Sequence, residues 1–146
     1  MTDVQRFALV EYTPNQMFDL VCDVQRYPEF LDWVRSAKVY EQSDAEQTAS
    51  LAVTLGGIRA QFTTLNRLSC PDSIEMRLRE GPFEDLKGRW RFSEAGGGCR
   101  VSLDLSFRFA GSFWMQPFRR GFSRIADRMV DDFCRRAEVM YGLHTS

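Results

Sequence analysis

The stretch CRVSLDLSFRF, residues 99–109, alternates apolar and polar side chains from its first residue to its last. The apolar positions are Cys99, Val101, Leu103, Leu105, Phe107 and Phe109. Because successive side chains of a strand point to opposite faces, the pattern places all of these on one face and leaves the other face polar. Such alternation is typical of an antiparallel sheet that covers a core on one side and meets water on the other.

The same period of two recurs in the segments that precede this strand. It is clear in ASLAVTLG (residues 49–56), SIEMRLRE (73–80) and EDLKGRWRFS (84–93), and RFALVEY (6–12) reads as a further strand near the start. The breaks LGGI, SCPD, EGPF and EAGGGC contain the Gly and Pro residues typical of hairpins and short loops. We therefore expect a curved antiparallel sheet of about six or seven strands.

Two helices complete the pattern. In residues 13–23, Thr13 suits the N-cap, Pro14 suits the first helical position, and Gln16 completes a capping box. In residues 117–141, apolar side chains recur at steps of three or four: Phe118, Phe122, Ile125, Met129, Phe133, Ala137 and Met140. A helix of this length spans about 35 Å, and its apolar side must pack across the sheet. The expected fold is α+β, a sheet wrapped around a long C-terminal helix.

The bulk composition excludes several classes of protein. The 146 residues fit one domain, residues 1–146. Nineteen basic and twenty acidic residues give a net charge of −1, which argues against a broad nucleic-acid surface, so we expect no DNA partner. No apolar run approaches the roughly 18 residues of a membrane span, and the start lacks the pattern of a signal peptide. We therefore expect a cytoplasmic protein.

The cysteines and the histidine argue against a metal site or nucleophilic catalysis. The four cysteines contain no CxxC pair, and we expect them to be reduced and mostly buried. The only histidine, His144, is two residues from the end, where a side chain is rarely held in place. Glu75, Arg77 and Asp104 fall on the polar face of the sheet. We expect no catalytic residue, no metal and no enzyme activity.

The inward positions of the sheet vary sharply in size, with Gly88 beside Trp90 and Ala60 beside Phe62. One interpretation is that small and large side chains interdigitate at ordinary core density. The other is a hydrophobic cavity with walls made by Phe62, Trp90, Phe92, Leu103, Phe107, Phe122, Ile125 and Met129. Such a cavity suits a prenyl ligand, since each buried methylene contributes about 0.8 kcal/mol and a few prenyl units suffice for micromolar binding.

Four segments of the chain resemble the coenzyme Q-binding, START-like family, also called polyketide cyclase/lipid transport, which includes RatA-type ribosome association toxins. The segments are YTPNQMFDLVCDVQRYPEFLDWV, GPFEDLKGRWRF, GCRVSLDLSFRF and FSRIADRMVDDFCRRAEVMYG, and the similarity covers residues 4–142. The resemblance implies a helix-grip (SRPBCC) fold and a cavity that holds ubiquinone or a similar prenyl lipid, with no other cofactor required. Asp32 and Val34 stand where the family often has Pro and Cys, which leaves loop rigidity and ligand choice open.

The connector RYPEFLDWV, residues 26–34, carries unusually many aromatic groups for a loop. Tyr27, Phe30, Leu31 and Trp33 either plug one end of the core or form the mouth of the cavity, facing Phe83. Thr64 and Asn66 continue the inward register of Phe62 and could donate hydrogen bonds to a quinone, although solvation at a strand end is the simpler interpretation.

The leading functional hypothesis is a non-enzymatic carrier of ubiquinone that supports respiratory electron transport, cytoplasmic but in peripheral contact with the inner membrane. The alternative is a protein that binds the large ribosomal subunit and blocks subunit association. A polyketide cyclase-like enzyme is a third hypothesis. All three derive from the resemblance.

The last helix offers a candidate docking surface. Most of its arginines alternate with acidic residues at ion-pair spacing, which predicts a mixed, solvated face. Arg119, Arg120 and Arg124 are the exception, because no acidic residue lies among them, and Trp114 precedes them closely. Basic and aromatic side chains together suit a membrane surface or ribosomal RNA.

Overall fold

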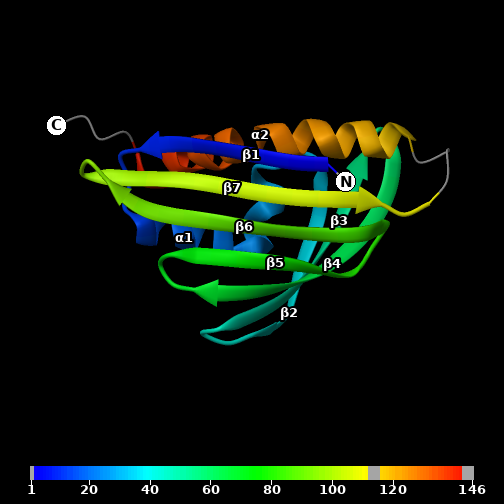
Figure 1. Ribbon diagram of the computed structural model, residues 1–146, viewed down its shortest axis with the longest axis horizontal. Coiled ribbons are helices and arrows are strands. Elements are labelled where there is room, and N and C mark those ends of the chain that lie inside the picture. The colour runs from blue at the N-terminus through cyan, green and yellow to red at the C-terminus, as the bar shows by residue number, and fades with distance from the viewer. Residues whose placement is uncertain (1, 112–115, 143–146) are drawn as a thin grey trace.

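The computed structural model describes residues 2–111 and 116–142. A seven-stranded antiparallel sheet in the order β1-β7-β6-β5-β4-β3-β2 curves around the long helix α2 (Figure 1). The elements are β1 (Thr2–Val10), α1 (Pro14–Cys22), the 3-10 helix η1 (Val24–Glu29), β2 (Val34–Gln42), β3 (Glu46–Leu55), β4 (Ile58–Ser69), β5 (Ser73–Glu80), β6 (Phe83–Ala95), β7 (Gly98–Phe109) and α2 (Gln116–Tyr141). The expected helix-grip fold is confirmed.

The sheet joins the first strand to the last. Each strand from β2 to β7 pairs with its neighbour in sequence, whereas β1 pairs with β7 in a register that runs from Thr2↔Phe107 to Val10↔Cys99. Along β7, Leu103 and Phe107 are buried while Asp104 and Arg108 are exposed. The alternation that predicted this strand is confirmed.

Helix α1 begins at the expected capping box. The Gln16 backbone amide donates to Thr13 Oγ1 at 3.0 Å, and the Thr13 amide donates to Gln16 Oε1 at 2.9 Å. The Tyr141 hydroxyl donates to the Gln16 carbonyl oxygen at 2.9 Å, and the Tyr12 hydroxyl donates to that of Gly142 at 2.7 Å. These bonds hold the C-terminal end of α2 against the start of α1.

The other end of α2 is held by a close approach of backbones. A Cβ atom added to Gly56, in the β3–β4 turn, would lie 2.3 Å from the Pro117 carbonyl oxygen. A Cβ atom added to Gly121 would lie 3.1 Å from the Leu55 Cβ atom. The β3–β4 turn therefore packs directly on the first turns of α2, and the contact leaves no room for a side chain at Gly56.

The apolar side of α2 fills much of the trough formed by the sheet. Its buried residues are Phe118, Phe122, Ile125, Ala126, Val130, Phe133 and Ala137. None of the helices in residues 2–111 and 116–142 has the length and apolar character needed to cross a bilayer.

All four cysteines are free. Burial raises the pKa of the Cys99 thiol. Burial, together with nearby Asp131, raises the pKa of the Cys134 thiol to about 11. Cys70 alone is fully exposed.

Candidate functional site

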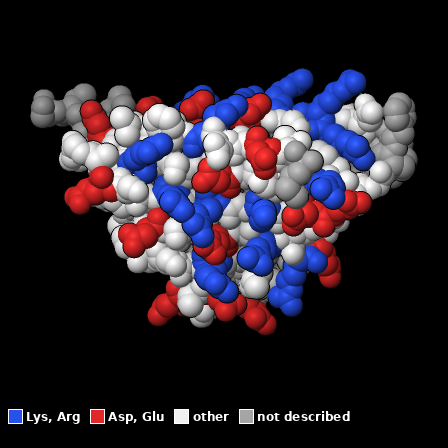
Figure 2. All heavy atoms as spheres, viewed as in Figure 1, with Lys and Arg blue, Asp and Glu red and all other residues white. Residues whose placement is uncertain are grey.

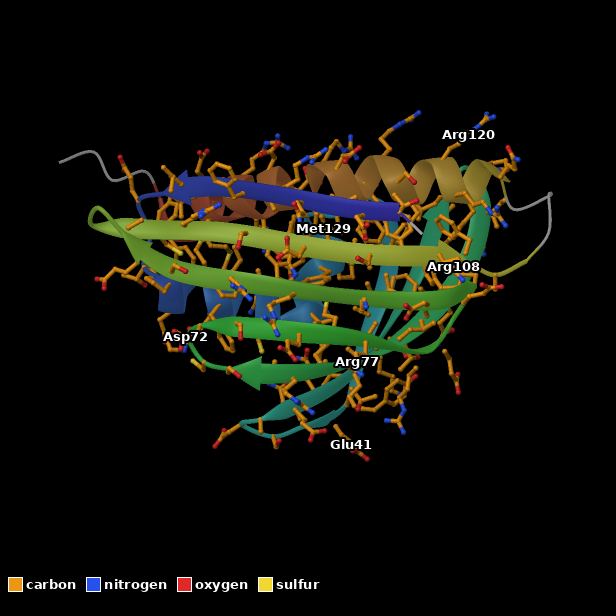
Figure 3. The ribbon with its side chains drawn as sticks, viewed as in Figure 1. Glu41, Asp72, Arg77, Arg108, Arg120 and Met129 are labelled. Atoms are coloured by element: carbon orange, nitrogen blue, oxygen red, sulfur yellow. The ribbon has the colours of Figure 1, made fainter. Side chains whose placement is uncertain are left out.

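A cavity of about 90 Å³ lies between the sheet and α2. Seven of the residues expected on its wall line it: Tyr27, Trp33, Phe62, Trp90, Leu103, Phe122 and Met129. The others are Val24, Ala49, Leu51, Thr64, Asn66, Met76, Leu86, Leu105 and Phe133. Met129, about halfway along α2, projects toward the sheet (Figure 3). The trough is therefore largely packed, with one void near its middle.

The remaining expected wall residues lie elsewhere in the core: Phe30, Leu31, Phe83, Phe92, Phe107 and Ile125. Phe92 packs between the Trp90 ring and Phe18 of α1, with centroid distances of 6.3 and 6.0 Å. Phe107 packs on Phe122 at 4.8 Å. These rings share the inward face with the cavity wall, but neighbouring side chains fill the space in front of them.

The aromatic connector covers the C-terminal half of α2. The rings of Tyr27 and Phe30 each lie 5.2 Å from that of Phe133, edge to face. The Arg136 guanidinium lies 5.0 Å from the Phe30 ring centroid and donates to Glu29 at 2.7 Å. Phe30 thus packs on the outside of Phe133, under an ion pair, rather than on the cavity.

Tyr27 and Phe30 do not face Phe83. The Phe83 ring packs on Phe118 and Phe122, at 6.5 and 4.9 Å, which lie near the start of α2. Phe133 lies eleven residues beyond Phe122, about 16 Å along the helix. The expectation that the connector faces Phe83 is therefore wrong for these two residues. Of the connector side chains, Tyr27 and Trp33 reach the cavity.

One end of the cavity wall is polar. Asn66 Nδ2 donates to Gln47 Oε1 and Thr64 Oγ1 donates to Asn66 Oδ1, both at 2.9 Å. Gln47 Nε2 donates in turn to the Cys22 carbonyl oxygen at 2.9 Å. Asn66 is only 4% exposed and Gln47 only 1%. Strand-end solvation is therefore the wrong interpretation for Asn66, because β4 continues to Ser69 and Asn66 is paired with both neighbouring strands.

Gln47 was not among the candidates from the sequence. It occupies the inward register of β3, two residues before Ala49. This spacing was the signal in the sequence that could have placed Gln47 on the inner face. Both atoms of its side-chain amide take part in the network: Oε1 accepts from Asn66, and Nε2 donates to the Cys22 carbonyl oxygen at the end of α1. Gln47 therefore fixes the orientation of the Asn66 amide at the cavity wall.

Trp33 brings an unused hydrogen-bond donor to the cavity wall. Its side chain is buried, and among the described residues its indole Nε1 has no hydrogen-bond partner. A buried donor without an acceptor costs about 1–3 kcal/mol. A guest with an acceptor atom near Trp33 would recover that free energy.

The cavity wall offers no charged group. Among the described residues that line it, none is Asp, Glu, Lys, Arg or His. The Tyr27 hydroxyl donates to the Val21 carbonyl oxygen, and burial raises its pKa further above the ordinary value. No cluster of His, Cys, Asp and Glu in residues 2–111 and 116–142 could hold a metal ion. The described wall thus supplies apolar contact and hydrogen bonds.

The size of the cavity limits what it can hold as it stands. An apolar cavity of about 150 Å³ accommodates benzene, and typical small-molecule sites measure about 300–1,000 Å³. The present cavity, at about 90 Å³, is smaller than either. A quinone ring with a prenyl tail would require the sheet, α2 or the connector to move apart.

The start of α2 carries the candidate docking surface. Figure 2 shows basic side chains gathered at the end of the molecule where α2 begins, while basic and acidic side chains mix over the sheet. Arg119 Nη2 donates to the Gly111 carbonyl oxygen at 3.1 Å, and its guanidinium lies 5.6 Å from the Phe109 ring centroid. Arg120 and Arg124 are exposed. Trp114 lies outside the described residues.

The second half of α2 has the mixed face expected from its sequence. Arg135 lies 3.5 Å from Asp132 and Arg136 lies 2.7 Å from Glu29. Asp127 is bonded to Arg6 of β1 at 2.7 Å. These charges are balanced within the protein itself.

Comparisons with known proteins agree with the fold and add information on function. A family model described as polyketide cyclase/dehydrase and lipid transport matches residues 10–134. The ribosome association toxin RatA of Pseudomonas aeruginosa is 44% identical over 97% of this chain and 99% of its own. The mitochondrial coenzyme Q-binding protein coq10 of Schizosaccharomyces pombe is 23% identical over 94% of this chain and 87% of its own. The crystal structure of TTHA0849 from Thermus thermophilus superposes with a TM-score of 0.79 at 18% identity, covering 94% of this chain and 95% of that one.

Proposed function

The chain belongs to the polyketide cyclase/dehydrase and lipid transport family, and we propose that it acts on ribosome association by binding the large ribosomal subunit. The observation that carries the proposal is the 44% identity to a ribosome association toxin over nearly the whole of both chains. The similarity to the coenzyme Q-binding protein is much lower, at 23%. In the proposed action, the bound protein opposes the joining of the two subunits.

The geometry of the interior supports a function on the outer surface. The cavity of about 90 Å³ is too small for a prenylated quinone, and the connector and α2 close over it. A carrier of such a ligand would have to open a packed interior, whereas a ribosome-binding protein can use the fold as it stands. Ubiquinone transport, the leading hypothesis from the sequence, therefore becomes the second candidate.

The first prediction tests the proposed function by sedimentation. Purified protein mixed with separated ribosomal subunits should sediment with the large subunit in a sucrose gradient. It should also lower the fraction of joined ribosomes when the small subunit and magnesium are added. The same gradient without added protein provides the control. Protein that stays at the top of the gradient and leaves the joined fraction unchanged would contradict the proposal.

The unpaired Trp33 donor favours a second function, the binding of a small, mainly apolar molecule that carries a hydrogen-bond acceptor. The acceptor would lie near Trp33 Nε1, and Thr64 and Asn66 supply further polar groups elsewhere on the cavity wall. A quinone carbonyl meets this chemical requirement, provided that the cavity opens enough to admit the ring and tail.

The second prediction tests this ligand site with Trp33→Phe. The substitution keeps an aromatic ring but removes the donor, so ligand occupancy should fall about tenfold, as expected for one lost hydrogen bond. Two effects on the stability of the unliganded protein oppose each other: removing a buried unpaired donor relieves its cost of about 1–3 kcal/mol, and the smaller ring loses packing contacts. The net change in the free energy of unfolding should therefore be smaller than the larger of the two effects. Native mass spectrometry after gentle purification measures occupancy, and organic extraction identifies the ligand. Equal occupancy in the two proteins, or an empty cavity in both, would exclude this role for Trp33.

A further inference from the structure

We infer that Arg120 and Arg124 form a binding site for the phosphate backbone of ribosomal RNA, an inference that rests on the proposed function. Both side chains are exposed and lie one helical turn apart, about 6 Å along the axis of α2. Arg120 points away from the sheet (Figure 3). Neither arginine lies within 4.0 Å of a carboxylate of the described residues.

The charge around the two arginines is uncompensated over the first three turns of the helix. Residues 116–126 contain three arginines and no acidic residue, and the first carboxylate, Asp127, is occupied by Arg6. On the sheet, by contrast, some basic side chains are paired with acidic ones of a neighbouring strand: Arg89 contacts Glu75, and Arg108 lies 3.6 Å from Glu84. No carboxylate within residues 116–126 balances Arg120 and Arg124, so an external anion can take that place.

The folded protein gains nothing from this placement of charge. Arg120 and Arg124 are like charges spaced four residues apart, and such a pair destabilises a helix. The repulsion between them is relieved when a phosphate group binds. The arrangement is thus explained by an anionic partner rather than by stability.

The three arginines of this region have different surroundings. Arg119 is half-buried and attached to Gly111 and Phe109, so it holds the chain that enters the helix. Arg120 and Arg124 make no such bonds within the described residues. They also stand on a rigid support, because the first turns of α2 are locked to the Gly56 turn. Little order has to be created in the backbone when they bind.

The neighbouring side chains favour RNA over a lipid surface. A helix that lies on a membrane needs an exposed apolar side, but Phe118, Phe122 and Ile125 are all buried against the sheet. The large exposed apolar residues of α2, Val139 and Met140, lie at its far end. The planar guanidinium group of arginine binds phosphate through paired hydrogen bonds. Within residues 116–126, the chemistry is that of phosphate recognition.

The third prediction compares two double variants that remove the same charge. The test variant is Arg120→Gln with Arg124→Gln, and the matched control is Arg77→Gln with Arg79→Gln. The control residues are exposed on β5, and Arg77 lies on the sheet, far from α2 (Figure 3). Binding is measured to purified large ribosomal subunits and to protein-free large-subunit RNA at several salt concentrations.

The test variant should bind both probes at least about tenfold more weakly than wild type. Its dependence of log affinity on log salt should be shallower by about 1.4–1.8, the loss expected for two phosphate contacts. The control variant should retain the wild-type affinity and salt dependence. The melting curve of the test variant should match that of wild type, because glutamine preserves helix propensity. The control variant should also match wild type, because both of its substitutions are at exposed strand positions.

Other outcomes would overturn the inference. Equal losses in the two variants would assign binding to net charge alone, and no loss in the test variant would place the RNA contact elsewhere. Wild-type binding to vesicles of anionic lipid, lost in the test variant, without RNA binding would assign the site to membranes. If wild type binds subunits but the test variant binds equally well, only the inference fails. If wild type binds neither probe, the proposed function fails with it.

Discussion

Phe133→Ala is expected to lower the free energy of unfolding by about 3–5 kcal/mol, the usual cost of deleting a buried phenylalanine side chain. The Phe133 ring is 1% exposed and lies 5.2 Å from each of the rings of Tyr27, Phe30 and Trp90. Its removal leaves the connector without its support and joins new empty space to the existing cavity. Urea unfolding followed by tryptophan fluorescence measures the loss.

Val139→Ala on the same helix is the matched control. Val139 is 71% exposed, so its truncation should change stability by no more than about 0.5 kcal/mol. A loss below about 1 kcal/mol at Phe133 would mean that its ring does not support the connector. The two roles predicted for the connector are separated by replacing Phe30 and Trp33 with Ala. If the connector is a plug, several kcal/mol of stability should be lost, whereas if it is a gate, ligand binding should be lost with a smaller change in stability.

Gly56→Ala is expected to destabilise the protein by about 2–5 kcal/mol, from two separate causes. Gly56 has φ of 59°, a left-handed conformation that costs other residues about 1–2 kcal/mol. The new Cβ atom would also clash with the Pro117 backbone at 2.3 Å, and overpacking of this kind costs about 1–3 kcal/mol. Because Pro117 is the second residue of α2, the loss should extend to the helix that carries Arg120.

The adjacent glycine separates the two causes. Gly57 has φ of 77°, but a Cβ atom there meets nothing within 4 Å, so Gly57→Ala should cost only the conformational part, about 1–2 kcal/mol. Chemical denaturation gives the two free energies, and hydrogen exchange shows whether the first turns of α2 loosen in Gly56→Ala alone. Equal losses at the two positions would mean that the turn does not hold the helix.

The strands and helices of this chain could be predicted because each buries one face against a continuous core. Alternation in residues 99–109 follows directly from the wet and dry faces of β7, and Thr13 and Gln16 form their capping box through local bonds alone. The Arg135–Asp132 and Arg136–Glu29 pairs likewise fit the charge pattern of the last helix.

The cavity could be predicted only in part, since its wall depends on how distant segments pack. Phe62 and Phe92 both point inward, yet only Phe62 borders the void, because Phe18 of α1 covers Phe92. Nothing in residues 26–34 indicates which end of α2 they contact. Asn66 appeared solvated because the length of β4 could not be judged from its composition.

The pairing of β1 with β7 determines when this protein can fold during synthesis. Thr2 meets Phe107, so β1 has no neighbouring strand until residues 99–107 have been translated. Helix α2, which covers the apolar side of the sheet, follows later still. Contacts so distant in sequence form slowly, and ribosomes add about 5–20 residues per second. The sheet therefore lacks the helix that covers its apolar face until residues 116–141 have been translated, and the fold cannot be completed before then.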